Sequence, residues 1–332
     1  MSLAPGGAGG RPEPPPAEGV RLDWGAIPAQ VRLAVEQQLG SAVAAAVSQP
    51  TGFSPGVASR LRLEDGRRVF VKAVGPVPNP GTPSMHRREA GIMAALPAAI
   101  PVPRLLWSYD DADTGWVVLV FEVVDGRHPA QPWDISELHR ILDALSALAD
   151  ALTPSPLMPP SVPTAGDDIA NNVRGWGQLR DVEPFYLEHL DAWSVRHLDA
   201  LVELESRAVS AVAGNTLLHF DVRADNILLT PEKVWFVDWP WACVGAAWVD
   251  VVFFAPSVTM QGGPPPEYMM ERHPSCRAAE PDAITAVVAA MAGYFTHQAL
   301  KPPPPGLPTL RAFQAAQGVV AREWVRQRTG WT

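Results

Sequence analysis

Nine consecutive residues, Leu218 to Asn226, form the feature of this sequence that most restricts its fold. They read Leu-His-Phe-Asp-Val-Arg-Ala-Asp-Asn, and Asp238 follows twelve residues after them in Val-Asp-Trp. The segment between them holds two short apolar runs, which predict a hairpin that returns Asp238 to the loop carrying Asp221 and Asn226. One carboxylate that accepts a hydroxyl proton, beside oxygen ligands that hold Mg²⁺ against nucleotide phosphates, is typical of phosphoryl transfer.

The same residues also fit a polar loop between two strands, with His219 packed inside and Asp225 and Asn226 as turn residues. That interpretation explains each residue alone. It does not explain carboxylates at both ends of a hairpin with so many apolar neighbours, because an unpaired buried charge is costly. We therefore favour a phosphoryl-transfer site.

The motif resembles that of the aminoglycoside phosphotransferase and choline kinase family, which has His-Gly-Asp-x-x-x-x-Asn followed by Ile/Val-Asp-Trp/Phe. Phe220 replaces the common glycine, and Asp238-Trp239-Pro240 stands where protein kinases have Asp-Phe-Gly. Neither change touches a group that does chemistry. The resemblance covers residues 45–260 and implies an α+β, two-lobed protein-kinase-like fold, with a small antiparallel-sheet N-lobe and a larger, mainly helical C-lobe.

The resemblance also implies roles for the motif residues. Asp221 is expected to be the catalytic base, and Asn226 and Asp238 are expected to hold Mg²⁺. Arg223 lies where protein kinases place a lysine that contacts the transferring phosphate, and an arginine there stabilises transition-state charge. The alternative for Arg223 is a surface arginine paired with Asp225.

An upstream β-hairpin is predicted, because residues 57–63 and 67–74 alternate apolar and polar side chains around an Asp-Gly turn. Lys72 lies in the second strand, where a lone lysine is commonly on a solvated face. Glu89 follows in a helix expected to begin at Thr82-Pro83 with an N-cap and a first-turn proline. In kinase-like folds a strand lysine clamps the nucleotide phosphates and a glutamate from the next helix holds it. We assign these roles to Lys72 and Glu89.

Two further segments complete the expected nucleotide site. The loop before the hairpin contains Gly52, Ser54 and Gly56, whose flexible backbone suits phosphate binding, although such a cluster is more often a simple turn. A later apolar run resembles the strand-to-hinge segment of the family, with backbone groups near Glu122 and Val124 at the adenine edge. The alternative there is a core strand with one exposed glutamate.

The expected organisation is a flexible Pro/Gly-rich tail at 1–19, a nucleotide-binding N-lobe at 20–124 and a catalytic, acceptor-binding C-lobe at 125–332. Helical periodicity is predicted over residues 27–47, 135–152, 195–212, 247–259, 281–300 and 309–328. Asp250 resembles the family's helix-start aspartate that braces the catalytic loop, and it also fits a simple helix cap.

Composition excludes several classes of protein. The formal charge of −9 speaks against nucleic acid as a partner, and no apolar run approaches the ~20 residues that span a bilayer. The N-terminus lacks a signal-peptide core. Cys243 and Cys276 are too few for a disulfide framework. We expect a cytoplasmic enzyme, a monomer or homodimer, without nucleic acid or membrane partners.

The function expected from these features is a small-molecule kinase that uses ATP or GTP, with Mg²⁺, to phosphorylate a hydroxyl of a small metabolite or antibiotic. Acids and aromatics near the expected acceptor site suit a cationic acceptor, unless the acids coat an exposed helix face. They are Asp167, Asp168, Glu183, Glu188 and Asp191, beside Trp176, Phe185, Tyr186 and Trp193. Two alternatives are a catalytically weak nucleotide-binding pseudokinase that acts as a regulator, and an unrelated two-domain enzyme with a coincidental motif.

Overall fold

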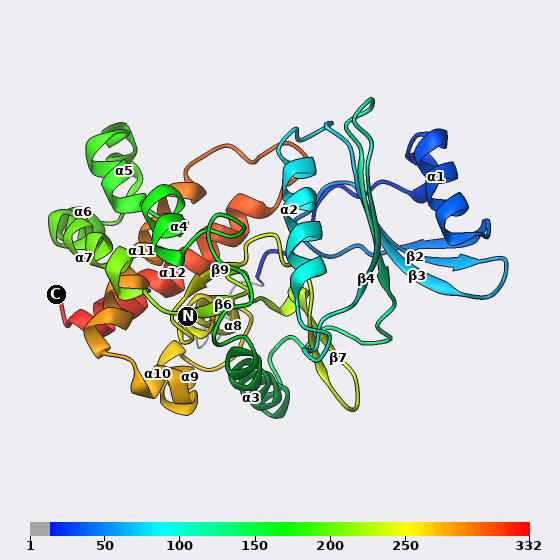
Figure 1. The fold of residues 1–332 in the computed structure, drawn as a ribbon. Coiled ribbons are helices and arrows are strands. Elements are labelled where there is room, and N and C mark those ends of the chain that lie inside the picture. The colour runs from blue at the N-terminus through cyan, green and yellow to red at the C-terminus, as the bar shows by residue number, and fades with distance from the viewer. Residues whose placement is uncertain (1–13) are drawn as a thin grey trace, which may run out of the picture.

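The chain forms a sheet-containing lobe and a larger helical lobe (Figure 1). The computed structural model describes residues 14–332. A five-stranded antiparallel sheet has the order β1-β2-β3-β5-β4. The elements of this part are η1 (Trp24–Ala26), α1 (Ala29–Leu39), β1 (Val43–Ser48), β2 (Val57–Leu63), β3 (Arg68–Val74), α2 (Thr82–Ala95), β4 (Leu105–Asp110) and β5 (Val117–Glu122). The predicted hairpin and the α+β two-lobed fold are confirmed.

Helices cover both faces of the sheet, which explains why β5 is apolar at almost every position. Successive side chains of a strand point to opposite faces. Val118 and Val120 pack with Val31 and Val35 of α1, whereas Leu119 packs in the main core that also contains residues of α2. In β3 the same alternation places Lys72 on the face of α2, so the lysine points into the cleft and not to solvent.

The remaining chain is mainly helical. Its elements are α3 (Ile135–Ala151), α4 (Ala165–Asn172), α5 (Gly175–Asp181), η2 (Pro184–His189), α6 (Ala192–Arg196), α7 (Leu198–Ala211), β6 (Thr216–Leu218), η3 (Ala224–Asn226), β7 (Ile227–Leu229), β8 (Val234–Phe236), β9 (Cys243–Gly245), α8 (Val249–Met260), α9 (Pro266–Arg272), α10 (Pro274–Ala278), α11 (Pro281–Ala299) and α12 (Leu310–Thr329). The largely buried helix α11 packs against α5, α7 and α12. Among residues 14–332, no helix combines the length and apolar character needed to cross a membrane.

Two predicted helices were wrong in extent. The helix expected over 27–47 ends at Leu39, because Gly40 adopts a left-handed φ of 69° and caps it, and β1 follows. The helix expected over 195–212 is two helices, α6 and α7, separated at His197. Thr82 is the first residue of α2 and not its N-cap, while Pro83 lies in the first turn as predicted.

The N-terminal segment differs from the expected tail over the part that the structure describes. Residues 1–13 of that tail lie outside the described residues. The Ala17 carbonyl accepts a hydrogen bond from the Gly52 N–H at 2.8 Å, and the Gly306 carbonyl accepts one from the Val20 N–H at 2.8 Å. This segment therefore joins the loop before β2 to the connection between α11 and α12.

Candidate active site

The catalytic loop runs from β6 through η3 into β7, and Asp250 braces it from behind. The Asp250 carboxylate accepts hydrogen bonds from the backbone N–H groups of His219, at 2.9 Å, and Phe220, at 2.7 Å. Phe220 has a φ of 64°, a left-handed conformation that is unfavourable for a bulky residue. The Asp250 contacts explain how the loop keeps this conformation, and they support the bracing role over a simple helix cap.

His219 is fully buried and joins the loop to the strand that precedes Asp238. Its Nε2–H donates to the Val237 carbonyl at 2.9 Å, and its Nδ1 accepts from the Asp221 N–H at 3.3 Å. Burial lowers the pKa of His219 to about 4, so the ring is neutral at pH 7. His219 is thus packed inside, as the alternative interpretation proposed, but it also positions both catalytic segments.

Asp221 and Arg223 face each other in the cleft. The Arg223 guanidinium contacts Asp221 directly and binds Asp225 through two hydrogen bonds of 3.0 and 2.9 Å. Burial raises the pKa of Asp221 to about 7, while the arginine opposes this shift. The Asn226 amide donates to the Asp221 carbonyl at 2.8 Å, which leaves the Asn226 Oδ1 as a further oxygen. Arg223 thus pairs with Asp225, as in the alternative, but within the site.

Asp238 returns to the loop through the predicted β7–β8 hairpin and meets the lysine of the sheet. Lys72 Nζ lies 2.6 Å from Asp238 Oδ1 and 2.7 Å from Glu89 Oε1. Burial opposes the charged form of Asp238, but Lys72 outweighs it and lowers the carboxyl pKa to about 2. The predicted Lys72–Glu89 pair therefore forms, and it connects the sheet, α2 and the hairpin in one network.

A cavity of about 130 Å³ lies between the sheet and the catalytic loop. The predicted site residues in its lining are Gly52, Ser54, Lys72, Glu89, Glu122, Val124, Asn226 and Asp238. The Glu122 side chain pairs with Arg104, and the Val124 carbonyl accepts from Arg60 at 3.3 Å. Asn226 and Asp238 both offer hard oxygen atoms on this cavity, so the donors fit Mg²⁺. Within residues 14–332, no cluster of three or more His, Cys, Asp or Glu residues is arranged to hold a metal.

The glycines of the loop before β2 allow its backbone conformation, but their amides are not available to a ligand. Gly52 and Gly56 have φ angles of 98° and 113°, and a Cβ at Gly56 would lie 2.7 Å from the Ala73 carbonyl oxygen. Their N–H groups donate to the carbonyls of Ala17 and Val20. These two amides are already engaged, and the lining of the 130 Å³ cavity does not include Gly56. The structure therefore does not support the expected phosphate contact for Gly56.

Two residues of this region were missed by sequence reasoning. Arg21 lines the same cavity; its guanidinium donates to the Gln49 carbonyl at 3.1 Å and to carbonyls of the glycine loop. Phe53, at the loop tip, lies between Arg223, 5.3 Å from its ring centroid, and Phe313, whose centroid is 5.1 Å away. Neither residue belongs to a local motif, because both reach the site through contacts distant in sequence.

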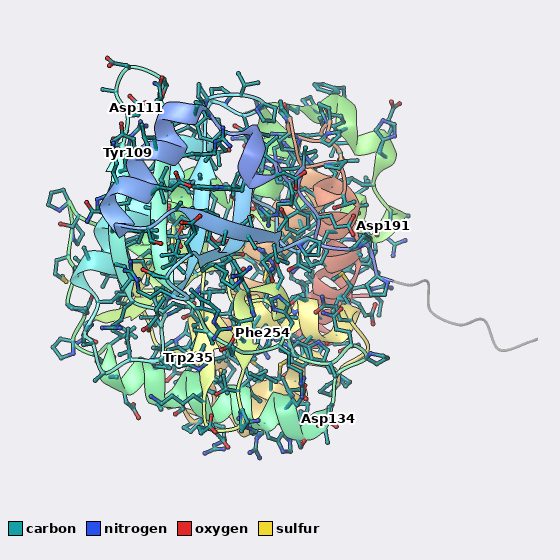
Figure 2. The ribbon with its side chains drawn as sticks, turned by 90° about the vertical axis from the view of Figure 1, so that its right-hand side faces the viewer. Tyr109, Asp111, Asp134, Asp191, Trp235 and Phe254 are labelled. Atoms are coloured by element: carbon teal, nitrogen blue, oxygen red, sulfur yellow. The ribbon has the colours of Figure 1, made fainter. Side chains whose placement is uncertain are left out.

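A larger cavity of about 400 Å³ adjoins Asp221 and Asp238. Of the nine acids and aromatics expected at the acceptor site, only Asp168 lines it. Trp176 is fully buried and donates to the Ala289 carbonyl, while Asp167 and Asp191 cap α4 and α6. Figure 2 shows Asp191 at the edge of the molecule. The other eight of these residues therefore do not line this cavity.

The fold and these contacts define a protein-kinase-like phosphotransferase, and comparison with known proteins identifies its family. Residues 51–286 match the model of the phosphotransferase enzyme family, so the chain belongs to that family. This membership confirms the predicted class, a phosphotransferase with an alcohol group as acceptor. No curated protein matches the chain significantly.

Solved structures show the same fold at low identity. A thermostable mutant of aminoglycoside phosphotransferase APH(4)-Ia, complexed with AMP-PNP and hygromycin B, is 17% identical with a TM-score of 0.58; the match covers 92% of this chain and 100% of that one. Spectinomycin phosphotransferase APH(9)-Ia, complexed with ADP and spectinomycin, is 12% identical with a TM-score of 0.57, covering 91% and 99%. Choline kinase LicA from Streptococcus pneumoniae is 13% identical with a TM-score of 0.56, covering 89% and 100%. These likenesses establish the fold alone.

Proposed function

We propose that the protein transfers the γ-phosphate of ATP or GTP to a hydroxyl of a small molecule, with Asp221 as the base. The observation that carries this proposal is the convergence of Asp221, Asn226, Asp238 and Lys72 on one cleft from three separate segments, namely the catalytic loop, the end of the β7–β8 hairpin and β3. The structural neighbours complexed with ADP or AMP-PNP, and with hygromycin B or spectinomycin, support the same reaction class.

Each side chain of the site has its own role in phosphate transfer. Asp221 faces the larger cavity, where it accepts the proton of the acceptor hydroxyl. Lys72 binds phosphate oxygens from the smaller cavity, and Arg223 stabilises the charge that develops on the transferring group. Asn226 and Asp238 would hold Mg²⁺, which would supply positive charge to neutralise the nucleotide phosphates.

Replacing Asp221 by Asn tests this assignment. The change keeps the side-chain shape but removes the proton acceptor, so turnover is expected to fall at least ~10²-fold while MgATP binding changes little. Asp134→Asn is the matched control, because Asp134 is exposed and caps α3 away from both cavities. ADP release and calorimetry give the two readouts. An Asp221→Asn variant with near wild-type turnover would remove Asp221 from the mechanism, and a wild type that binds MgATP without transfer to any hydroxyl would favour a pseudokinase.

A further inference from the structure

The larger cavity is lined in part by aromatic side chains. Its volume of about 400 Å³ suits a ligand of drug size. Besides Phe53, the aromatic residues in the lining are Phe220, Trp241, Phe253, Tyr294, Phe295 and Phe313. They come from the catalytic loop, the segment after β8, and helices α8, α11 and α12, so the wall surrounds the cavity from several directions. A ligand with an apolar body would bury that body against these rings.

The acids of the cavity are already paired with bases. Its lining contains four, Glu89, Asp168, Asp221 and Asp238. Lys72 contacts both Glu89 and Asp238, and Arg223 contacts Asp221. The remaining acid, Asp168, accepts a hydrogen bond from Asn172 at 3.1 Å through Oδ1, while its buried Oδ2 lies 4.0 Å from the Arg88 guanidinium and has no hydrogen-bond partner within the described part of the chain. A cationic ligand would therefore compete with a resident base at Glu89, Asp221 and Asp238.

The other polar groups of the wall favour neutral oxygen atoms over cations. Arg311 Nη1 donates at 2.8 Å to the amide oxygens of both Gln298 and Gln314. An arginine has no acceptor, so it fixes these oxygens toward itself. The Gln314 NH₂ group donates to the Tyr294 hydroxyl at 3.5 Å, and the Gln298 NH₂ group is left as a donor. His86 also lines the cavity, and burial lowers its pKa to about 4, so it is neutral at pH 7. Amide donors bind hydroxyl, ether or carbonyl oxygens and repel an ammonium group.

We propose that the acceptor is a neutral hydroxylated molecule with an apolar body, which packs against the aromatic wall and directs its hydroxyl at Asp221. This inference rests on the proposed function, since it names the acceptor of that reaction. It replaces the cationic acceptor expected from the sequence, because most of the acids that suggested a cation lie outside the cavity.

The first experiment measures binding in the presence of MgADP, so it needs no turnover. The probes are 4-cyclohexylbutan-1-ol, its cationic counterpart 4-aminobutan-1-ol, glucose and kanamycin. Isothermal calorimetry is expected to give a Kd for the cyclohexyl alcohol at least about tenfold below that of each other probe, because only its ring buries apolar surface. Tighter binding of 4-aminobutan-1-ol or kanamycin, or no preference among the probes, would overturn the proposal.

A variant then locates the binding site. Phe253→Leu keeps an apolar side chain but removes a ring that packs 4.7 Å from Phe220. It is expected to weaken binding of the cyclohexyl alcohol by about fivefold and to leave 4-aminobutan-1-ol unchanged. Phe185→Ala, at an exposed ring outside the cavity, is the matched control and leaves both affinities unchanged. Equal affinities in wild type and a folded Phe253→Leu variant would place the probe elsewhere and sink the proposal.

Phosphate transfer is measured separately, as ADP release with MgATP and each probe. Transfer to the cyclohexyl alcohol above the rate with glucose supports the acceptor class. If that alcohol binds with the expected preference but no probe is phosphorylated, the result counts against the proposed function and leaves the character of the cavity established. If kanamycin is phosphorylated and the cyclohexyl alcohol is not bound, the function stands and the neutral acceptor is refuted.

Discussion

Lys72→Met should destabilise the protein more than any change to its two acidic partners. The Lys72 side chain is 13% exposed, Glu89 is 2% exposed and Asp238 is 27% exposed, so water screens these charges only in part. The three groups together carry a formal charge of −1. Removing the lysine changes this formal charge to −2 and leaves the two carboxylates without a cation between them. Glu89→Gln instead brings it to zero and leaves the Lys72–Asp238 pair intact.

The magnitude follows from the cost of leaving buried charges unpaired. Breaking a buried ion pair by deleting one partner costs about 3–5 kcal/mol, and the partial exposure of Asp238 places Lys72→Met near the lower limit, about 3 kcal/mol. Glu89→Gln loses one charge-assisted hydrogen bond, a cost of about 1–2 kcal/mol. At roughly 2–4 °C per kcal/mol, Lys72→Met lowers the Tm by about 6–12 °C.

The charge argument is tested by combining the two changes. The double variant again carries a charge of −1, so its destabilisation should be about 1–2 kcal/mol smaller than the sum of the single variants. Urea and thermal unfolding are measured without nucleotide and with EDTA. Lys233→Met, at an exposed lysine, is the matched control and changes the Tm by less than about 2 °C. Additive effects would show that like-charge repulsion is not the cause and would refute the reasoning.

The Asp238 contribution to the pH dependence has a definite sign, although burial raises the pKa of its neighbour Glu89, which contributes in the opposite direction. Lys72 holds the pKa of Asp238 at about 2 despite burial, against an ordinary value of 3.8. A depressed carboxyl pKa contributes stability that is complete above the unfolded value and is lost as the pH falls toward the folded value. The wild type should therefore lose this contribution between about pH 4 and pH 2. In Lys72→Met the carboxylates repel each other, so acid should relieve part of the defect.

Three further predictions concern the nucleotide side and the catalytic loop. At an MgADP concentration 100-fold above its Kd, the wild type gains about 2.7 kcal/mol of stability. Asp238→Ala should abolish the Mg²⁺-dependent part of this gain, and Asn226→Ala should reduce it. Undiminished Tm shifts in thermal melts of these variants would place the metal elsewhere. Arg21→Gln should weaken MgADP binding by at least about fivefold, because it removes a cation from the cavity and releases the carbonyls of the glycine loop; an unchanged calorimetric Kd would make Arg21 irrelevant to the nucleotide. Phe220→Gly should be about 1 kcal/mol more stable than Phe220→Ala, since only glycine tolerates the φ of 64° without strain, and the reverse order in urea unfolding would contradict this.

The parts of the fold that sequence predicted well are those specified by local pattern. Period-two alternation gave the β2–β3 hairpin, and the pairing of Val57 with Ala73 confirms its register. The β7–β8 hairpin follows from two short apolar runs, and it brings Asp238 to the cavities that Asp221 and Asn226 line, as expected; its contact with Lys72 was not predicted. The spacing of Lys72 and Glu89 carried information because the strand and the helix have few ways to pack against each other. Local propensity and tertiary contact agree at these positions.

The parts that sequence missed depend on contacts between distant segments. The N-terminal residues Ala17 to Arg21 show neither periodicity nor a motif, and their hydrogen-bond partners, among them Gly52, Gly306 and Thr309, are distant in sequence. The helix predicted to continue past Leu39 fails because β1 adds to the edge of a sheet formed by later residues. A strand whose partner is not adjacent in sequence has a weak signal of its own, since strand propensity reflects its neighbours.

Aspartates show most directly what cannot be predicted from the sequence alone, because this one residue type serves three purposes in this chain. Asp167 and Asp191 cap helices, where a carboxylate accepts backbone N–H groups and favours the positive end of the helix dipole. Asp250 accepts two N–H groups of the catalytic loop, yet it too lies in the first turn of a helix. Asp221 alone among these faces the larger cavity. An acid before an apolar helical run therefore indicates a cap first, and it indicates a ligand-binding group only when tertiary structure leaves its oxygens facing a cavity.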